Sequence, residues 1–533
     1  MESKHSPEAV KEQYERAVSY NAAIDLYNTV KQNENFFIGN QWEGVNAPDL
    51  DKPVINILKR VILFFVASIV SDDISTEISQ FGGDHEGDNT LLLVREEVDR
   101  IIETQKLKDK NRLLIRNAAV DGDACLYLRF DPDAESIGPT DGDIAAEIID
   151  NTNVFFGNPE VDEIQSQPYV ILMLRRDLES LKEELKADGA EESLLLSLRP
   201  DDDPNGMNRE REEGKVTVLV KFWKERETGT VWVTKTANDV CLMPPTDTGY
   251  KLYPVAYMSW DKIKNRYHGQ AAVTGLIPNQ IFVNKLFAMA MEQVKKMAFP
   301  KIIYNRSLFP NGFNNRVGEA VGAAGDPTSA VMQNVRPADM SGQVMELVEK
   351  TINYTRDMMG ASDASLGNIR PENTSAIIAV QKSSSMPLEL NRMSFYQFVE
   401  DYIRIMVDMM RVNFGMRYVM AKDENGVLQR QQFDFSTLQD MKLQLNVSVG
   451  AAAYWSELMQ MQTTDNLFAK GIIKDAVTYL ESIPDEYIKN KSSIIEDLKR
   501  AQLPTPTPTP TPTGNGADLA AMMGGNLNAL PKM

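Results

Sequence analysis

Apolar residues between Gly275 and Gly415 recur at helical spacing and predict two long helices and an interrupted third. In the first, residues 276–299, one broad arc is apolar and a narrower opposite arc is polar. The apolar arc holds Phe282, Val283, Leu286, Phe287, Met289, Ala290, Val294 and Met297, and the polar arc holds Asn284, Lys285, Glu292, Lys295 and Lys296. We expect Pro278 in the first turn, where its missing N–H costs nothing.

The second predicted helix covers residues 343–359 and ends at Gly360. Residues 301–337, between the two helices, are rich in Gly, Asn and Pro and begin with a strand-like stretch. Two helices that return across such a connection form an antiparallel hairpin, whose first arm is about 36 Å long at about 1.5 Å per residue. Its apolar faces are wider than one partner helix can cover, so we expect other copies of the chain to cover the rest.

The third predicted helix follows a small, polar loop of residues 361–372. Asn373 is a suitable N-cap for a helix that runs to residue 385. We expect Pro387 to kink this helix, which resumes near residue 388 with an aromatic, buried face and ends at Gly415.

The rest of the chain mixes both element types and predicts an α+β fold. Helices are expected over residues 6–32, 54–69, 91–105, 109–120, 178–187 and 191–198, and strands over 124–130, 144–149, 169–174, 216–225, 231–235, 417–420, 429–435 and 442–449. A helical cluster is expected over residues 455–469, 472–482 and 492–502. Pro-Thr pairs over residues 504–513 then predict an extended spacer, followed by a flexible tail.

Composition narrows the functional classes. The 533 residues are 43% hydrophobic and carry a formal charge of -20, so the chain can bury a large core in several subdomains but does not fit a protein that grips phosphates. Cys125 and Cys241 suit a reducing compartment. The polar start of the chain lacks a signal-peptide pattern, and the longest apolar run, residues 61–70, is too short to cross a bilayer of about 30 Å.

Catalytic motifs are missing from the sequence. It has no Walker A loop, HExxH, CxxC pair or GxSxG, and His5, His85 and His268 are far apart. We therefore expect a protein that is not an enzyme.

Three sets of charged residues leave alternatives open. Asp201, Asp203, Asn205, Gly206 and Glu212 have EF-hand spacing, but Pro204, Arg209 and the predicted strand that follows do not fit, and a solvated acidic loop is the other interpretation. A nuclease would need Asp72, Asp73, Asp121 and Asp123 to converge on Mg²⁺, whereas surface or capping roles need no convergence. Lys285, Lys295 and Lys296 could line a path for DNA or form a solvated face.

Several short motifs occur in a fixed order along the chain. They are FFIGNQW at 36–42, PVIN at 53–56, AAVDGD at 118–123, NVFFGNP at 153–159, Tyr253-Pro254, Gln280 and Asn284 within 269–284, and NTSA at 373–376. Around a core of helix, loop, helix, loop and kinked helix, this order resembles the portal proteins of tailed double-stranded DNA bacteriophages. The resemblance covers about residues 20–502.

The resemblance implies a ring of about twelve copies at one capsid vertex, with DNA packaged and ejected through its centre. It implies an N-terminal arm and α+β wing over residues 1–264, stem helices over 265–300 and 338–360, a clip over 301–337, a tunnel loop over 361–372, a kinked wing helix over 373–415, wing strands over 416–450 and a helical crown over 451–502. The linker and tail over residues 503–533 match nothing in the family. Candidate channel residues are Asp363, Ser365, Asn368 and Arg370 in the tunnel loop and Lys285, Lys295 and Lys296 on the stem.

The implied partners are double-stranded DNA, bound non-specifically, the terminase large subunit, a head–tail adaptor and the major capsid or scaffold protein. The resemblance carries no cofactor, metal, catalytic residue or membrane, and it implies location in the virion, with assembly in the host cytoplasm. A net-negative ring repels phosphates, so a duplex slides through with little sticking. The alternative is another oligomeric virion scaffold or adaptor without a DNA channel.

Overall fold

The computed structural model describes most of the chain up to residue 449 and parts of the chain beyond it. The described residues are 4–48, 50–70, 74–80, 85–134, 142–187, 189–201, 214–298, 301–307, 309, 324, 326, 332–335, 342–358, 388–422, 428–439, 443–449, 463–473, 475–481, 483, 491, 494–495 and 498. Contacts divide the chain into two units, Met1–Ala453 and Tyr454–Met533. The expected α+β class is confirmed. The predicted helix start at Asn373 and kink at Pro387 lie outside the described residues.

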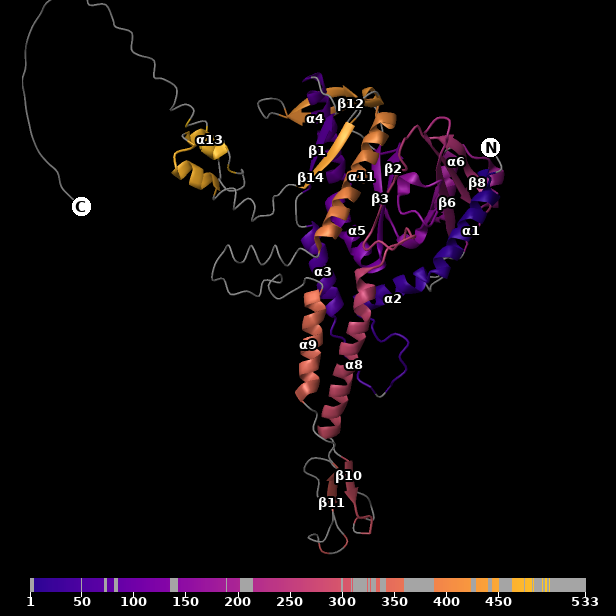
Figure 1. Ribbon diagram of the computed structural model, residues 1–533. Coiled ribbons are helices and arrows are strands. Elements are labelled where there is room, and N and C mark those ends of the chain that lie inside the picture. Colours follow the sequence, from indigo (N-terminus) through magenta and orange to yellow (C-terminus); the bar gives the residue numbers. More distant parts are fainter. Residues whose placement is uncertain are drawn as a thin grey trace, which may run out of the picture. The chain divides into compact units, whose positions relative to one another are not determined.

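The N-terminal helical pattern forms two helices instead of one. Helix α1 spans Pro7–Ala23 and helix α2 spans Leu26–Ile38 (Figure 1). The break falls at Ile24 and Asp25, where Asp25 has a left-handed φ of 59°. The prediction of one continuous helix over residues 6–32 is therefore wrong at this point, because the turn lets α1 fold back onto a sheet while α2 enters the main core.

The next three helices correspond to those predicted over residues 54–69, 91–105 and 109–120. They are α3 (Ile57–Val70), α4 (His85–Thr104) and α5 (Leu107–Asp121). The run over residues 61–70 supplies the buried side of α3, with Val61, Ile62, Phe65 and Ile69 in the core. Helix α3 packs on α5, and α5 packs on a three-stranded sheet.

That sheet has the order β3-β2-β9 and is antiparallel throughout. Strands β2 (Asp123–Asp131) and β3 (Asp143–Ile149) confirm two predicted strands. Strand β9 (Val255–Ser259) pairs with the other edge of β2, so β2 is central and almost wholly buried. This position follows from its near-continuous apolar sequence.

A second, five-stranded sheet has the order β4-β5-β6-β7-β8. Its strands are β4 (Val154–Phe156), β5 (Val170–Asp177), β6 (Lys215–Lys224), β7 (Val231–Ala237) and β8 (Val240–Asp247), and helices α6 (Leu178–Ala187) and α7 (Glu192–Ser197) connect β5 to β6. Strand β8 was not predicted, because it contains Pro244 and Pro245; it lies at the sheet edge, where proline is tolerated. In β4, β5 and β6, alternate residues face the main core, and the others face α1.

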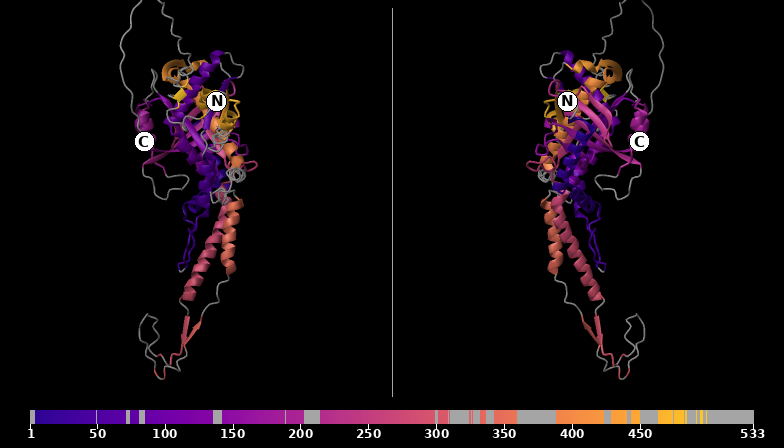
Figure 2. Two further views of the ribbon diagram at one scale, coloured as in Figure 1. Left: turned by 90° about the vertical axis from the view of Figure 1, so that its left-hand side faces the viewer. Right: turned by 90° about the vertical axis from the view of Figure 1, so that its right-hand side faces the viewer.

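The helix–loop–helix segment forms α8 (Ala272–Ala298) and α9 (Gly342–Met358), which lie side by side (Figures 1 and 2). Beyond them, β10 (Lys301–Tyr304) pairs antiparallel with β11 (Met332–Val335), a strand that the sequence pattern did not predict. Helix α8 starts four residues earlier than expected, so Pro278 lies inside the helix and not in its first turn. There it removes one intrahelical hydrogen bond.

The remaining elements of the first unit are α11 (Glu389–Asn413), the predicted hairpin of β12 (Met416–Lys422) and β13 (Leu428–Asp434), and β14 (Leu443–Val449). The aromatic face of α11 is buried in the main core, as predicted. Strand β14 pairs with β1 (Ile74–Gln80), a polar strand that its own sequence did not reveal. In the second unit, residues 463–469 and α13 (Ala476–Glu481) are helical, and Phe468 stacks on Tyr479.

Candidate functional site

Helix α8 is attached to α3 and to the end of α2 by a series of hydrogen bonds between buried side-chain amides. Gln280 Oε1 accepts a hydrogen bond from the backbone N of Ile57 at 3.0 Å, the first residue of α3. Gln280 Nε2 donates to the carbonyl of Ile55 at 2.7 Å and to Asn284 Oδ1 at 2.9 Å. This one side chain therefore caps the start of α3 and fixes the segment that leads into it.

Asn284 continues the chain of amides toward α2. Its Nδ2 donates to Gln41 Oε1 at 2.6 Å, and Gln41 Nε2 donates to the carbonyl of Phe36 at 2.9 Å. The sequence pattern placed Asn284 on the solvated arc, but its side chain is buried. The assignment was wrong because these amides satisfy one another, which removes the cost of burying them.

The outer faces of α8 and α9 carry apolar residues that the described part of the chain leaves exposed. Phe282 and Met289 on α8 are 41% and 63% exposed, and Leu347 and Tyr354 on α9 are 47% and 64% exposed. The two residues of each pair are seven apart, so each pair forms a short stripe along its helix. We call them the α8 stripe and the α9 stripe.

Contact between the two helices uses other positions. Val348 and Thr355 of α9 are buried, and Asn279 Nδ2 of α8 donates to Thr355 Oγ1 at 3.1 Å. Within the described residues, the apolar surface of the pair is thus wider than the contact between α8 and α9. This width is what the hydrophobic pattern predicted.

The three candidate lysines are all exposed on α8, but two of them are neutralised locally. Lys295 forms an ion pair with Asp51, and Lys296 forms one with Glu292 at 2.7 Å. Lys285 forms no ion pair among the described residues. Of the three, Lys285 therefore presents the least compensated charge. The other candidate channel residues, Asp363, Ser365, Asn368 and Arg370, lie outside the described residues.

A buried polar centre, missed by the sequence analysis, fixes the start of α8. His268 Nδ1 lies 2.9 Å from Asp123 Oδ2, and His268 Nε2 lies 3.2 Å from Asn21 Oδ1. Asp123 Oδ1 accepts from the backbone N of Gly269 at 2.8 Å. Gly122 lies against the same segment with a φ of 105°, and a Cβ there would come within 2.8 Å of the Gly269 carbonyl. The apolar sequence around Asp123 gave no signal of this contact.

Two of the four carboxylates considered for a nuclease have other partners. Asp123 contacts His268 and the backbone N of Gly269. Asp121 Oδ2 lies 3.9 Å from Arg116 Nη1, and burial raises the pKa of Asp121 to about 7. Asp72 and Asp73 lie outside the described residues. Across the described ranges, no three His, Cys, Asp or Glu side chains gather closely enough to hold a metal ion.

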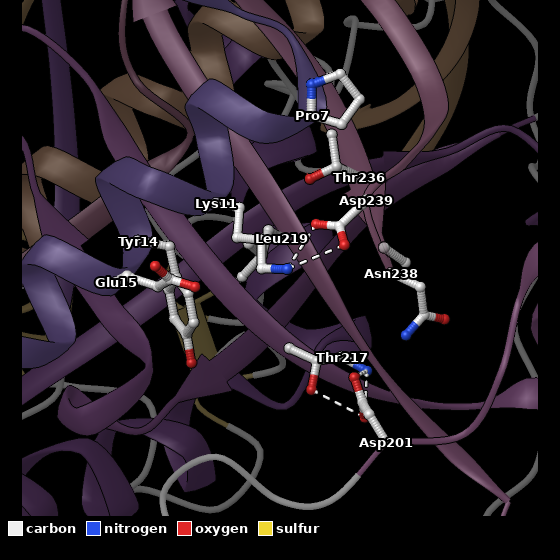
Figure 3. A pocket seen from close by; sticks show the side chains of 11 residues that line it. Pro7, Lys11, Tyr14, Glu15, Asp201, Thr217, Leu219, Thr236, Asn238 and Asp239 are labelled. Carbon is white, nitrogen blue, oxygen red and sulfur yellow. Dashed lines mark hydrogen bonds and ion pairs between the residues drawn. The ribbon is translucent and has the colours of Figure 1, made fainter.

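Of the five residues with EF-hand spacing, the structure describes only the first, Asp201. The Asp201 carboxylate pairs with Arg175 and accepts from the backbone N of Thr217 at 3.0 Å, so it fastens the start of β6. Asp203, Asn205, Gly206 and Glu212 lie outside the described residues. Asp201 also borders a cavity of about 350 Å³ between α1 and strands β6 and β7 (Figure 3).

Comparison with protein families identifies one relationship. A family model described as phage P22-like portal protein matches residues 175–432, a range that includes α8, α9 and α11. Comparison with curated protein sequences finds no match. In the part of the chain that the structure describes, no helix has both the length and the apolar content of a membrane span.

Proposed function

We propose, since the chain belongs to the P22-like phage portal protein family, that about twelve copies of it form a ring at one capsid vertex. Double-stranded DNA enters and leaves the capsid through the centre of this ring. The family is structural and not enzymatic. The ring itself therefore guides DNA, and a terminase drives it.

The observation that carries this proposal is the pair of exposed apolar stripes. The α9 stripe of one copy packs against the α8 stripe of the next copy, a head-to-tail contact that closes into a ring when its rotation divides a full turn. Burying one Leu, Met or Phe side chain contributes about 1.5–3 kcal/mol. Each contact covers the exposed parts of Phe282, Met289, Leu347 and Tyr354, which are 41–64% exposed in one chain, and repeated around the ring this burial supplies a sizeable part of the free energy of assembly.

We assign the parts of the subunit accordingly. Helices α8 and α9 form the stem, and residues 301–337, which include β10 and β11, form the clip that docks terminase and the head–tail adaptor. Residues 361–372 form the tunnel loop, with Asp363, Ser365, Asn368 and Arg370 toward the DNA. The wing comprises residues 1–264 and 373–450 and contacts the capsid or scaffold protein, and residues 451–502 form the crown.

Weak attraction to DNA suits this role. The chain has a net charge of -20, and the pairing of Lys295 and Lys296 with carboxylates removes two of the three candidate lysines on α8 from strong phosphate contact. A ring of Lys285 side chains then offsets part of the repulsion without arresting the duplex. The protein assembles in the host cytoplasm and functions in the virion.

The test is electron microscopy of the purified protein in end-on view. The proposal expects rings of about twelve subunits around an open channel wide enough for a duplex of about 20 Å. Closed discs without a channel would instead support a virion scaffold or adaptor. Single subunits under all conditions tested would refute both.

A further inference from the structure

The N-terminal arm, residues 4–23, buries few of its own side chains fully. Helix α1 covers the face of the five-stranded sheet that points away from the main core, yet of its 17 residues only Val10 and Asn21 are buried. Around Val10 lies a small cluster that is separate from the main core and contains Phe155, Ile171, Met173 and Leu219. By contrast, α2 contributes Phe36 and Phe37 to the main core.

The seam between the arm and the sheet is incompletely packed. A cavity of about 350 Å³ lies there. Lys11 on α1 and Asp239 after β7 form an ion pair of 2.8 Å beside it, and Figure 3 shows the side chains that line it. Both side chains of this pair are half exposed, and such pairs contribute little. Four polar atoms on the arm, His5 Nδ1, Gln13 Oε1, Tyr20 Oη and Asn21 Nδ2, are buried without a hydrogen-bond partner in the described part of the chain.

The arm also covers Lys221, which forms no ion pair with a carboxylate among the described residues. Lys221 is 1% exposed, and its Nζ donates to the backbone carbonyl of Lys4 at 3.1 Å. The rings of Tyr169 and Trp223 lie 5.2 and 5.6 Å from Nζ. One carbonyl and two ring faces replace bulk water only in part, so covering this amine opposes docking of the arm.

The connection between α1 and α2 is strained. Tyr14, Val18, Ala22 and Leu26 continue one helical spacing across it, and neither glycine nor proline occurs between residues 8 and 38. The chain nevertheless breaks at Ile24, and Asp25 adopts a left-handed conformation that L-residues disfavour. Local sequence thus favours one straight helix, and tertiary contacts hold it bent.

We propose that the arm is exchanged between copies: straightening at residues 24–25 joins α1 and α2 into one helix, which carries α1 onto the same sheet face of a second copy. The second copy offers the cluster, the Asp239 carboxylate and the Lys221 amine that the first offers, so exchange gives up no contact. It also relieves Asp25, and strained short hinges are a known cause of such exchange. The inference rests on the proposed ring, which places copies side by side at high effective concentration.

A mixed-ring cross-linking experiment tests the exchange. Chains carrying Lys11→Cys alone are assembled with chains carrying Asp239→Cys alone, both in a Cys241→Ser background, and treated with a short bis-maleimide. Exchange brings the two cysteines together in different chains, so covalent dimers are expected on a denaturing gel. The matched control replaces Lys11→Cys by Arg16→Cys, on the exposed opposite side of α1, and should give few dimers. Mixed rings that yield no dimers above this control would overturn the inference.

Two hinge variants give an independent readout. Asp25→Gly removes the strain of the bent hinge, whereas Asp25→Ala keeps the strain and favours the straight helix. The ratio of exchanged to unexchanged arms, measured by the same cross-linking, should be about fivefold or more higher in Asp25→Ala than in Asp25→Gly. This factor follows from the cost of about 1–2 kcal/mol of a left-handed residue. Equal ratios would contradict the hinge mechanism.

Particle size separates this inference from the proposed function. Light scattering of the same samples before cross-linking reports whether rings form. Rings without interchain links overturn the exchange alone. If no ring forms, the proposed function fails, and the exchange is then judged on two-chain species: links in these support it, and exclusively single chains refute it.

Discussion

Replacing Gln280 by methionine should destabilise the junction of α8 with α2 and α3 far more than its small change in volume suggests. Methionine fills similar space but cannot make the hydrogen bonds of the glutamine amide to Ile57 N, Ile55 O and Asn284 Oδ1. Asn284 Oδ1 and Leu58 N then lose the partner that Gln280 supplies, whereas Ile57 N keeps its bond to the Ile55 carbonyl. Each buried group left without a partner costs about 1–3 kcal/mol, and the penalties do not add fully. We therefore expect the variant to lose about 3–5 kcal/mol of unfolding free energy.

Two measurements check this expectation. Urea unfolding followed by circular dichroism gives the global change, and hydrogen exchange at the amides of Ile57 and Leu58 gives the local one. Those amides should exchange at least about 100-fold faster in the variant, since 3 kcal/mol corresponds to roughly that factor. The matched control is Lys285→Met, the same product residue at an exposed position of the same helix, with an expected change within about 0.5 kcal/mol.

An effect of Gln280→Met as small as that of the control would refute the reasoning. It would mean that the amide chain from Phe36 through Gln41 and Asn284 does not anchor α8. A large global effect with unchanged exchange at Ile57 would place the anchor elsewhere.

Three further predictions concern assembly, titration and DNA. The double variant Leu347→Asp, Tyr354→Asp should keep its secondary structure. Its ring fraction in size-exclusion chromatography should fall at least tenfold, because charges replace the α9 stripe. An unchanged ring fraction would contradict the proposed contact. Burial lowers the pKa of Lys221 from 10.5 to about 8, so the folded state binds this proton less tightly and its stability should rise as pH increases from about 8 to 10.5. Lys221→Met should accordingly gain about 2–3 kcal/mol over wild type at pH 7 and progressively less toward pH 10, measured by urea unfolding at each pH; a pH-independent difference would argue against a buried charge. Deleting residues 361–372 should leave rings intact and lower DNA packaging or retention, measured by nuclease protection, and normal packaging would count against a tunnel-loop role.

Periodicity predicted the helices of this fold well, because each long helix buries a continuous apolar face. The spacing over residues 276–299 gave α8 to within a few residues at each end, and the spacing from about residue 388 to Gly415 gave the buried face of α11. Strands β2 and β6 were equally clear, since their apolar residues alternate or run together in stretches of strand length.

The errors arose where distant parts of the chain decide the local structure. Asn284 is polar but buried, because Gln41 arrives from a distant segment and accepts from its amide, while Gln280 one turn earlier on the same helix donates to it. Strand β1 has no apolar alternation, and only its pairing with β14 defines it. The bend at Ile24 was not predictable from the sequence, because neither glycine nor proline occurs near it.

The candidate site was predictable in outline only. The lysines of α8 and its wide apolar arc were visible in the sequence, but the pairing of Lys295 with Asp51 joins residues 244 positions apart. The contact between His268 and Asp123 was hidden for the same reason, with 145 positions between the two. Spacing along one helix shows which side chains share a face, and it does not show which distant partners neutralise them.

Native mass spectrometry of the purified full-length protein tests the central claim most directly. One chain has a mass of 59.8 kDa. If the α8 and α9 stripes are covered by neighbouring copies, the dominant species should have about twelve times that mass, and Leu347→Asp should return it to the mass of one chain. A dominant species of a single chain in the wild-type protein, at all concentrations and salt conditions tested, would contradict the account.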